Sequence, residues 1–465
     1  MSKVLRILLT ALSPAIVLTA AALPTSVDNT RLKYFPPVIS QQGGSCAQAS
    51  GIGYMFTYEI NRLLDRDASA SAANRFAYLF TWNMVNDGDD NGGFVDQGLL
   101  IARNFGVMTE ADYGTPSVYD FRWASGYEKY HNAARYRVKT ISTYSNQTDA
   151  DIENIKSLLA AGHVLTYSSQ SVGWTFNEDY SGPSETGYHA LLTRLATSGS
   201  HALTIAGYDD LVESTDTAGV KHKGAFIVIN TWGSWFGDKG RFYLPYYFFT
   251  HRTSYLETLL STTVTGCTVY YHEPKIMFRI HLHYTSRDDL GFTYGAAAAP
   301  FARSASNNYN SVILDHQGGD HAMGGVYNAS TAADFEFGID YTDHMRSDNE
   351  AFGRFFLNIQ RAQRGRKFGE GHVDYISVID YRGAQPVEYI CRNIAGRELK
   401  LGRNDFTIPA FHAGHFSASP VSPLSNDGTA KAGKYYIVRT ASGHYAKVRF
   451  DGSADALQMK YKMIR

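Results

Sequence analysis

The sequence has few cysteines: its 465 residues include only three, Cys46, Cys267 and Cys391. At most one disulfide can form among three cysteines, so at least one thiol is left over. We expect Cys267 and Cys391 to be structural, and these two can pair with each other. Because a chain of this length does not need disulfides to stabilise its core, the remaining thiol is a candidate reactive group.

Strong charge of either sign and long apolar runs are also missing. The formal net charge is −1, and no large basic or acidic block occurs. Nucleic-acid binding calls for a basic face, so this function class is not expected. Beyond the first 22 residues, no stretch is long and apolar enough to cross a bilayer, and we expect no integral membrane association. The 44% of apolar residues predicts packed cores, and the length predicts two or three domains.

The N-terminus has the layout of a signal peptide. Lys3 and Arg6 precede an apolar run from Ile7 to Ala22, which ends in small residues. The run is short for a membrane span, and Pro14 interrupts it. We therefore predict a signal peptide over residues 1–22 and a secreted, periplasmic or cell-envelope location after its removal.

The region that follows is predicted to be helical first and β-rich afterwards. Apolar spacings of three and four residues predict helices over 46–64, 98–104 and 148–161. Thr148 or Asp149 is the expected cap of the third helix, and Gly162 its stop. Strands separated by turn residues are predicted over 202–206, 225–229 and 241–244. These elements together predict an α+β domain over residues 23–272.

Beyond residue 274 the pattern becomes one of short alternating strands. They are predicted over 276–284, 335–341, 355–360, 373–381, 435–440 and 444–450. Regular short strands with turns favour a β-sandwich-like domain over 275–385, followed by a small β-rich unit over 386–465. The linkers are short, so we expect the domains to touch. This β-rich region is a candidate for binding a surface ligand.

Cys46 is predicted to lie at the start of a helix. The preceding Gly43-Gly44-Ser45 supplies a turn and a capping residue. Six apolar residues fall on one side of this helix and predict a single buried stripe: Ala49, Ile52, Phe56, Ile60, Leu63 and Leu64. Because a helix N-terminus carries partial positive charge, this position favours the thiolate form of Cys46.

Three segments carry the chemistry: Gln-Gln-Gly-Gly-Ser-Cys ending at Cys46, His201-Ala followed by Gly207-Tyr208, and Asn230-Thr-Trp232-Gly with a Trp-Phe-Gly after it. In this order they resemble the papain family of cysteine peptidases, over roughly residues 23–272. The resemblance implies a two-lobed α+β fold, with a helical lobe and a β-barrel-like lobe. It also implies hydrolysis of polypeptides, without a metal or cofactor.

The residues support the same chemistry without the family name. Acyl transfer from an amide needs a nucleophile, a proton carrier and donors for the oxyanion. Cys46 is the expected nucleophile, and His201 can lower its pKa as imidazolium and later return a proton to the leaving amine. Asn230 is expected to hold the imidazole ring, because a neutral amide suffices beside a thiolate–imidazolium pair. The resemblance implies that Trp232 shields this hydrogen bond from water.

The resemblance also implies an oxyanion donor and a substrate-binding segment. A Gln side chain acts with the Cys46 backbone N–H, and Gln41 fits this role, although its loop to Cys46 is one residue short; Gln42 is the alternative. Gly92 and Gly93 resemble the family's Gly-Gly segment, where a peptide backbone can approach closely. The Asp87, Asp89 and Asn91 spacing also hints at a calcium loop, but Gly98 stands where that pattern needs Glu.

Other interpretations remain open at this stage. Ala47 stands where the family usually has Trp, the framework cysteines are missing, and an inhibitory pro-segment has no room after the predicted signal. A catalytically inactive binding protein, or another Cys-His amide hydrolase acting on cell-wall peptides, is the alternative function. His189 competes with His201 but lacks the following Gly-Tyr. His281 and His283 point to one strand face, which we interpret as solvated rather than as a metal site.

Overall fold

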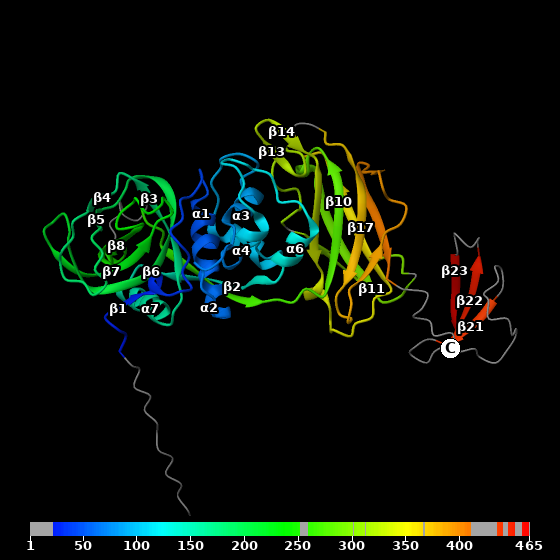
Figure 1. The fold of residues 1–465 in the computed structure, drawn as a ribbon, viewed down its shortest axis with the longest axis horizontal. Coiled ribbons are helices and arrows are strands. Elements are labelled where there is room, and N and C mark those ends of the chain that lie inside the picture. The colour runs from blue at the N-terminus through cyan, green and yellow to red at the C-terminus, as the bar shows by residue number, and fades with distance from the viewer. Residues whose placement is uncertain are drawn as a thin grey trace, which may run out of the picture. The chain divides into compact units, whose positions relative to one another are not determined.

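The computed structural model describes residues 22–251, 259–300, 302–311, 313–365 and 368–410, together with three strands between 435 and 464 (Figure 1). The predicted signal peptide lies outside the described residues, apart from its last position. The chain divides into two compact units. The first unit comprises Met1–Gln41, Thr57–Ser69 and Ile141–Cys267, and the second comprises Gln42–Phe56, Ala70–Thr140 and Thr268–Arg465. No helix among the described residues is long and apolar enough to span a membrane.

A large mixed sheet forms most of the first unit. Its strands follow the order β2-β9-β3-β6-β7-β8-β5-β4, and β1 pairs with β6. The strands are β1 (Ser26–Asp28), β2 (Tyr136–Ser145), β3 (Leu165–Val172), β4 (Thr175–Asn177), β5 (Leu191–Arg194), β6 (Ser198–Thr215), β7 (Lys221–Ile229), β8 (Arg241–Pro245) and β9 (Thr263–Tyr271). The predicted strands 202–206, 225–229 and 241–244 fall within β6, β7 and β8, which confirms them.

Short helices accompany this sheet. They are the 3-10 turn η1 (Asn29–Arg31), α2 (Thr57–Leu64), α7 (Asp149–Ala160) and α8 (Tyr247–Thr250). Helix α7 begins as predicted: the Thr148 hydroxyl accepts a hydrogen bond from the Asp151 N–H at 3.1 Å, and the Asp151 carboxylate accepts one from the Thr148 N–H at 3.0 Å. Gly162, with φ +84°, follows the helix. Ile155, Leu159, Leu203 and Phe226 belong to the same buried cluster, so α7 packs on the sheet through its apolar face.

The helical part of the second unit begins at Cys46. Its elements are α1 (Cys46–Gln48), the π-helical segment η2 (Ala49–Phe56), the 3-10 turn η3 (Ala72–Asn74), α3 (Tyr78–Val85), α4 (Val95–Asn104), α5 (Glu110–Tyr113) and α6 (Tyr127–Ala133). The predicted helix 46–64 is present as α1, η2 and α2 in succession. The single buried stripe is wrong: every residue of η2 is buried, whereas Leu63 is 50% exposed. Two glycines explain part of the burial of η2 on all sides. The absence of a Cβ lets Val95 pack directly against Gly51 and Gln48 against Gly98.

Two antiparallel sheets form the β-sandwich of the second unit. One has the order β15-β10-β17-β18, with β19 paired to β17, and the other the order β12-β11-β16-β20. The strands are β10 (Ile276–Tyr284), β11 (Leu290–Ala297), β12 (Asn307–Asn310), β15 (Asp334–Asp340), β16 (Arg354–Arg361), β17 (Gly371–Asp380), β18 (Val387–Ile390), β19 (Arg397–Glu398) and β20 (Gly402–Pro409), with the separate pair β13 (Gly325–Tyr327) and β14 (Ser330–Ala332) and the 3-10 turns η5 (Arg287–Asp289) and η6 (Thr342–His344). Aromatic side chains of β10 and β16 meet between the sheets, with Phe278 and Phe355 ring centroids 5.8 Å apart.

The sandwich extends further along the chain than predicted. Strand β18 pairs with β17, and β20 pairs with β16 along its whole length. The boundary predicted after residue 385 therefore lies too early, because residues 387–409 complete both sheets. A separate three-stranded sheet contains β21 (Tyr435–Arg439), β22 (Tyr445–Asp451) and β23 (Gln458–Ile464). The predicted hairpin is β21 and β22, and the sequence analysis missed β23.

Helix α6 and residues 136–140, the part of β2 that belongs to the second unit, join the helical part of this unit to the sandwich. The Tyr127 N–H donates to the Glu336 carboxylate at 3.1 Å, and Tyr127 and Met277 share a buried cluster. A guanidinium nitrogen of Arg137 lies 2.7 Å from a carboxylate oxygen of Asp340, and both side chains are almost fully buried. The expectation that the short linker brings these regions into contact is thus correct within this unit.

Candidate active site

His201 and Asn230 lie on neighbouring strands of the first unit. His201 is near the start of β6, opposite Ser169 of β3, and Asn230 directly follows β7. Strands β6 and β7 are antiparallel neighbours, so the start of one lies beside the end of the other. The Asn230 N–H donates to the Gly240 carbonyl at 2.9 Å, which holds the turn after β7. Sheet register therefore brings together two residues that are 29 positions apart in the sequence.

A hydrogen bond joins the two side chains and fixes the imidazole tautomer. Nε2 of His201 lies 2.8 Å from Oδ1 of Asn230, and the Thr231 N–H also donates to this Oδ1, at 2.7 Å. Because a backbone N–H can only donate, the Asn230 atom must be the amide oxygen. His201 therefore donates through Nε2–H, and its neutral ring keeps Nδ1 as the nitrogen that can take up a proton. His189 is placed elsewhere, with Nδ1 3.2 Å from the Tyr180 carbonyl.

Aromatic side chains surround His201. The Trp232 ring stacks on the imidazole with a centroid distance of 4.6 Å, and Trp174 contacts both rings. Only 4% of His201 is exposed. Burial lowers the pKa of His201 to about 4, and the hydrogen bond to Asn230 opposes this shift. In this environment the ring is neutral at pH 7, so it can accept a proton whenever an acid or a counter-charge reaches Nδ1.

Gln41 and Gln42 point in different directions. The Gln41 N–H donates to the Thr231 carbonyl at 2.7 Å, and the Thr231 hydroxyl donates to the Gln41 side-chain oxygen. Gln41 thus lies beside the residue that follows Asn230. The side-chain oxygen of Gln42 instead accepts the Tyr119 N–H at 3.1 Å, in the second unit. Of the two glutamines, Gln41 is the one that the first unit places next to the His201–Asn230 pair.

Cys46 is the first residue of α1 in the second unit and is partly exposed. The Ser45 N–H donates to the Gln42 carbonyl at 3.2 Å, which closes the predicted turn. The predicted capping role of Ser45 is wrong, because its hydroxyl donates back to the Gln42 carbonyl at 2.6 Å and makes no bond to the helix. The helix start at Cys46 therefore carries its backbone donors without this side-chain cap.

The loop before Cys46 packs against the Gly92–Gly93 segment. The Gly44 N–H donates to the Asp90 carboxylate at 2.6 Å, and a Cβ on Gly43 would overlap the same carboxylate. Because Gly43 has φ +47°, glycine suits this position in both respects. Gly92 is exposed, and a Cβ there would meet only the Gly44 carbonyl oxygen, at 3.9 Å.

Two buried side chains hold this segment from behind. The indole N–H of Trp82 donates to the Asn91 carbonyl at 2.9 Å, and the Gln48 amide donates to the Phe94 carbonyl at 2.9 Å. Phe94 itself is 73% exposed. The backbone from Asn91 to Phe94 is thus fixed, while Gly92 and the Phe94 ring are exposed.

The structure also describes the two other cysteines and the residues of the calcium alternative. Cys267 and Cys391 are buried, and the described residues, which include every cysteine, contain no disulfide. Burial raises the pKa of both thiols, so they are poor nucleophiles. Asp89 and Asp90 use their carboxylates to accept backbone N–H groups of the loop. Among the described residues, the acidic side chains near Asp87 form no metal-ligating group of three.

Sequence reasoning missed several residues of this site. It did not find Trp174, which contacts His201 and Trp232, although a tryptophan after Gly173 offered a weak signal. It also missed Asp90 and Gln48, because a hydrogen bond to a distant backbone group leaves no local pattern. A cavity of about 430 Å³ in the second unit is lined by Arg103, Arg137, Tyr294 and neighbouring residues, and none of the predicted site residues lines it.

Known proteins are similar to the N-terminal part of this chain. The sequence model of the papain family cysteine proteases matches residues 23–250. No curated protein matches the chain. Similar solved structures include xylellain, a cysteine protease from Xylella fastidiosa, with 21% identity, a TM-score of 0.36 and coverage of 53% of this chain and 87% of that one.

Two further solved structures are also similar to this chain. The proform of the ragweed pollen allergen Amb a 11, a cysteine protease, has 16% identity, a TM-score of 0.36 and coverage of 54% and 67% of the two chains. A recombinant stem bromelain precursor has 16% identity, a TM-score of 0.33 and coverage of 53% and 70%. The ordered cysteine, histidine and asparagine motifs and the family match lead to one conclusion: residues 23–250 belong to the papain family of cysteine proteases.

Proposed function

We propose that the chain hydrolyses peptide bonds through an acyl-thioester on Cys46, with His201 as acid and base. The neutral His201 imidazole first takes the proton of the Cys46 thiol at Nδ1. The Cys46 thiolate then attacks the carbonyl carbon, and the C–N bond breaks as the His201 imidazolium gives its proton to the leaving amine. Water then attacks the thioester, His201 takes up a proton from it, and the carboxylic product leaves. The hydrogen-bonded His201–Asn230 pair carries this proposal, because it leaves Nδ1 to exchange the proton.

Asn230, Trp232 and Gln41 complete the proposed machinery. Asn230 orients the imidazole, and Trp232 covers their hydrogen bond against water. Gln41, together with the Cys46 N–H, stabilises the oxyanion. The contacts of Gln41 with Thr231 support this choice over Gln42, whose side-chain oxygen accepts a different backbone group.

Polypeptides are the proposed substrates, and an extended main chain binds along Gly92 and Gly93. The open space around Gly92 and the fixed backbone from Asn91 to Phe94 support this role. We also propose that the protein acts outside the cytoplasm, as the N-terminal signal predicts, and that the β-rich region binds a surface ligand rather than taking part in catalysis.

The decisive experiment labels the protein with an irreversible thiol-directed peptidyl inhibitor and maps the modified residue. We expect modification of Cys46 alone, because burial raises the pKa of the thiols of Cys267 and Cys391. Cys46→Ala should abolish turnover of an unfolded protein substrate, whereas Cys391→Ala should preserve it. Unchanged turnover in Cys46→Ala would remove Cys46 as the nucleophile, whereas absence of turnover in the parent chain as well would favour a binding protein. Release of cell-wall peptides without hydrolysis of any unfolded protein would favour the other amide hydrolase.

A further inference from the structure

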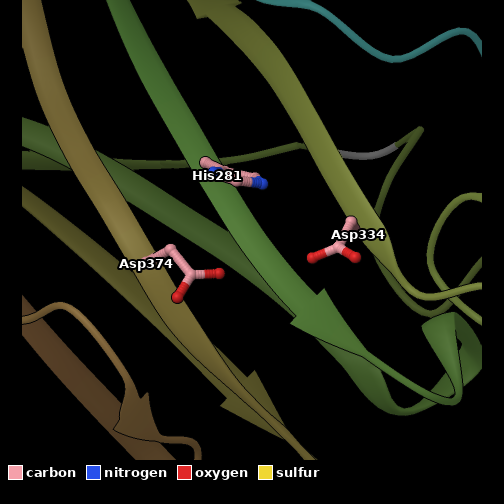
Figure 2. Close-up of side chains that lie close together, drawn as sticks. All are labelled: His281, Asp334 and Asp374. Carbon is pink, nitrogen blue, oxygen red and sulfur yellow. The ribbon is translucent and has the colours of Figure 1, made fainter.

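Three potential metal ligands meet on the face of the sandwich sheet that points away from the second sheet. His281 is on β10, Asp334 starts β15, and Asp374 is on β17 (Figure 2). Strand β10 lies between the other two in the sheet. One ligand atom from each of the three side chains lies within 4.8 Å of the other two. Residues far apart in the sequence therefore converge on one point of the surface.

A β-bulge brings Asp374 to this point. Along β10 and β17, His281 pairs with Tyr375, but the next residue, Leu282, pairs with Val373. Asp374 is thus the extra residue of the bulge, and it shares the outer face with Tyr375 instead of alternating to the inner face. Bulges are enriched where a strand has to re-aim a side chain, and here the re-aimed side chain is a carboxylate beside an imidazole.

Two more histidines lie within hydrogen-bonding distance of the two carboxylates. Nδ1 of His283 lies 3.2 Å from Oδ1 of Asp334, and Nε2 of His372 lies 3.2 Å from Oδ1 of Asp374. The His283 and His372 rings stack, with centroids 5.2 Å apart and an angle of 4° between their planes. Histidine–carboxylate pairs of this kind orient ligands in metal sites and tune their basicity.

The charged group opposite His281 is already paired with other residues. Glu336 is opposite His281 on β15, but it pairs with Arg279 at 2.7 Å and accepts the Tyr127 N–H. Within the described part of the chain, the His281 imidazole takes part in no hydrogen bond or ion pair. The Asp334 and Asp374 carboxylates thus offer oxygen ligands for a cation on either side of the His281 imidazole.

We propose that His281, Asp334 and Asp374 bind a divalent transition-metal ion of the zinc class, with His283 and His372 as second partners. An imidazole ligand favours zinc and its neighbours over calcium or magnesium, which prefer oxygen ligands. Zinc with three protein ligands keeps a position for water, which suits an exposed site. When ligand atoms bind zinc at about 2.0–2.2 Å, they lie closer to one another than the 4.8 Å within which the three ligand atoms lie here. The exposed Asp334 side chain therefore moves inward on binding. The ion then links β15, β10 and β17.

Calorimetric titration with Zn²⁺ tests the proposal on the full chain carrying Cys46→Ser, so that the nucleophilic thiol does not compete. We expect one ion per chain. His281→Ala and Asp374→Asn should each weaken binding more than His372→Ala, for which loss of a second partner predicts roughly a 10–100-fold effect. His251→Ala removes an exposed histidine of the first unit and is the matched control, with binding unchanged. Co²⁺ should give the absorption spectrum of a low-coordinate nitrogen and oxygen site.

The variants also distinguish a metal site from a simple folding contact. Circular dichroism without metal should be the same for Asp374→Asn and the parent chain, while Zn²⁺ should raise the melting temperature of the parent only. Equal Zn²⁺ affinity in the parent, His281→Ala and Asp374→Asn would overturn the site. Displacement of Zn²⁺ by an equal concentration of Ca²⁺ would overturn the assigned class of metal.

Discussion

His201 and His281 are both strand histidines next to side-chain oxygens, yet their surroundings differ in every other respect. His201 is buried among tryptophan rings and bonds to a neutral amide, and burial lowers its pKa to about 4. His281 lies on an open sheet face between two carboxylates. A dry, uncharged pocket suits a ring that exchanges a proton, whereas exposed carboxylates suit a ring that shares a cation. Partner charge and burial, rather than residue type, thus distinguish the two proposed roles.

The largest expected effect comes from removing the buried ring. His201→Ala should lower kcat by at least the 10²–10⁴-fold that general acid–base catalysis typically supplies, because the variant removes the proposed proton carrier beside Asn230. Steady-state kinetics on a peptide substrate measures this. His189→Ala is the control, since that ring lies against the Tyr180 carbonyl and not against Asn230. A larger loss in His189→Ala than in His201→Ala would reverse our assignment.

A third histidine combines the features of both sites and tests the role of partner charge in stability. His272 is buried like His201 but bonds to a carboxylate: its Nε2 lies 2.6 Å from Asp340, which also pairs with Arg137. Asp340→Asn should lower the free energy of unfolding by roughly 3–5 kcal/mol, because it leaves a buried guanidinium without its counter-charge. Urea unfolding measures this.

The exposed ion pair of Arg403 and Asp405 is the matched control. Asp405→Asn should cost less than about 1 kcal/mol, and equal losses in the two variants would contradict our view of burial. Burial alone would raise the pKa of Asp340, but the hydrogen bond to His272 and the charge of Arg137 hold it below its usual value. This stabilisation is therefore complete above the usual carboxylate pKa and is lost as the pH falls below it.

Exchanging the partner of His201 tests the comparison directly. Asn230→Asp is nearly isosteric and places a carboxylate beside the buried ring, as at His272. We expect the pKa of His201 to rise from about 4, since a nearby negative charge favours imidazolium. NMR titration of the Cys46→Ala variant measures the pKa of His201 in the absence of the thiol. Asn230→Ala should not raise the pKa, and a rise of equal size in that variant would show that packing, not charge, sets it.

The same titration predicts how stability depends on pH. The pKa of His201 falls from 6.5 to about 4 on folding, so the unfolded chain binds the proton more readily. The contribution of this group to stability is complete above pH 6.5 and declines as the pH falls towards 4. Asn230→Asp should reduce the fall in the free energy of unfolding between pH 6.5 and pH 4. Urea unfolding over this pH range measures it.

The smallest expected effect concerns a carboxylate near the proposed nucleophile, Cys46. Asp90→Asn weakens the charge-assisted hydrogen bond from the Gly44 N–H, which loosens the turn before Cys46. We expect a several-fold fall in kcat/KM and a matching fall in the rate of Cys46 alkylation. Asp89→Asn is the control, because that carboxylate accepts only the neighbouring Asp90 N–H. If both variants lose activity equally, the loop and not the Gly44 contact is responsible.

Periodic features of the fold were predictable from the sequence. The predicted strand 276–284 coincides with β10, and Thr148 caps α7 as expected, because alternation and capping are local patterns. Helix α3 was missed because its residues are apolar nearly all round, so that no polar face marks its period. The domain boundary predicted after residue 385 was too early because β20 pairs with β16, some 40 residues earlier. The sequence of either strand alone does not indicate such a pairing.

For the site, motif order identified His201 and Asn230, which the sheet then joins. The sequence could not identify Trp174 or Asp90, whose roles depend on contacts with residues far along the chain. The interpretation of His281 and His283 as a solvated face rested on β10 alone. Asp374 reaches that face only through a bulge, and a bulge changes the register of two strands together.

The absence of disulfides among the described residues, which include all three cysteines, has a practical consequence. Many extracellular proteins face a conflict between a framework that must stay oxidised and a catalytic thiol that must stay reduced. Here the framework depends on packing and buried ion pairs such as Arg137 with Asp340. Reductants can therefore protect the proposed nucleophile at no cost in stability, so storage and assay conditions can be chosen for Cys46 alone.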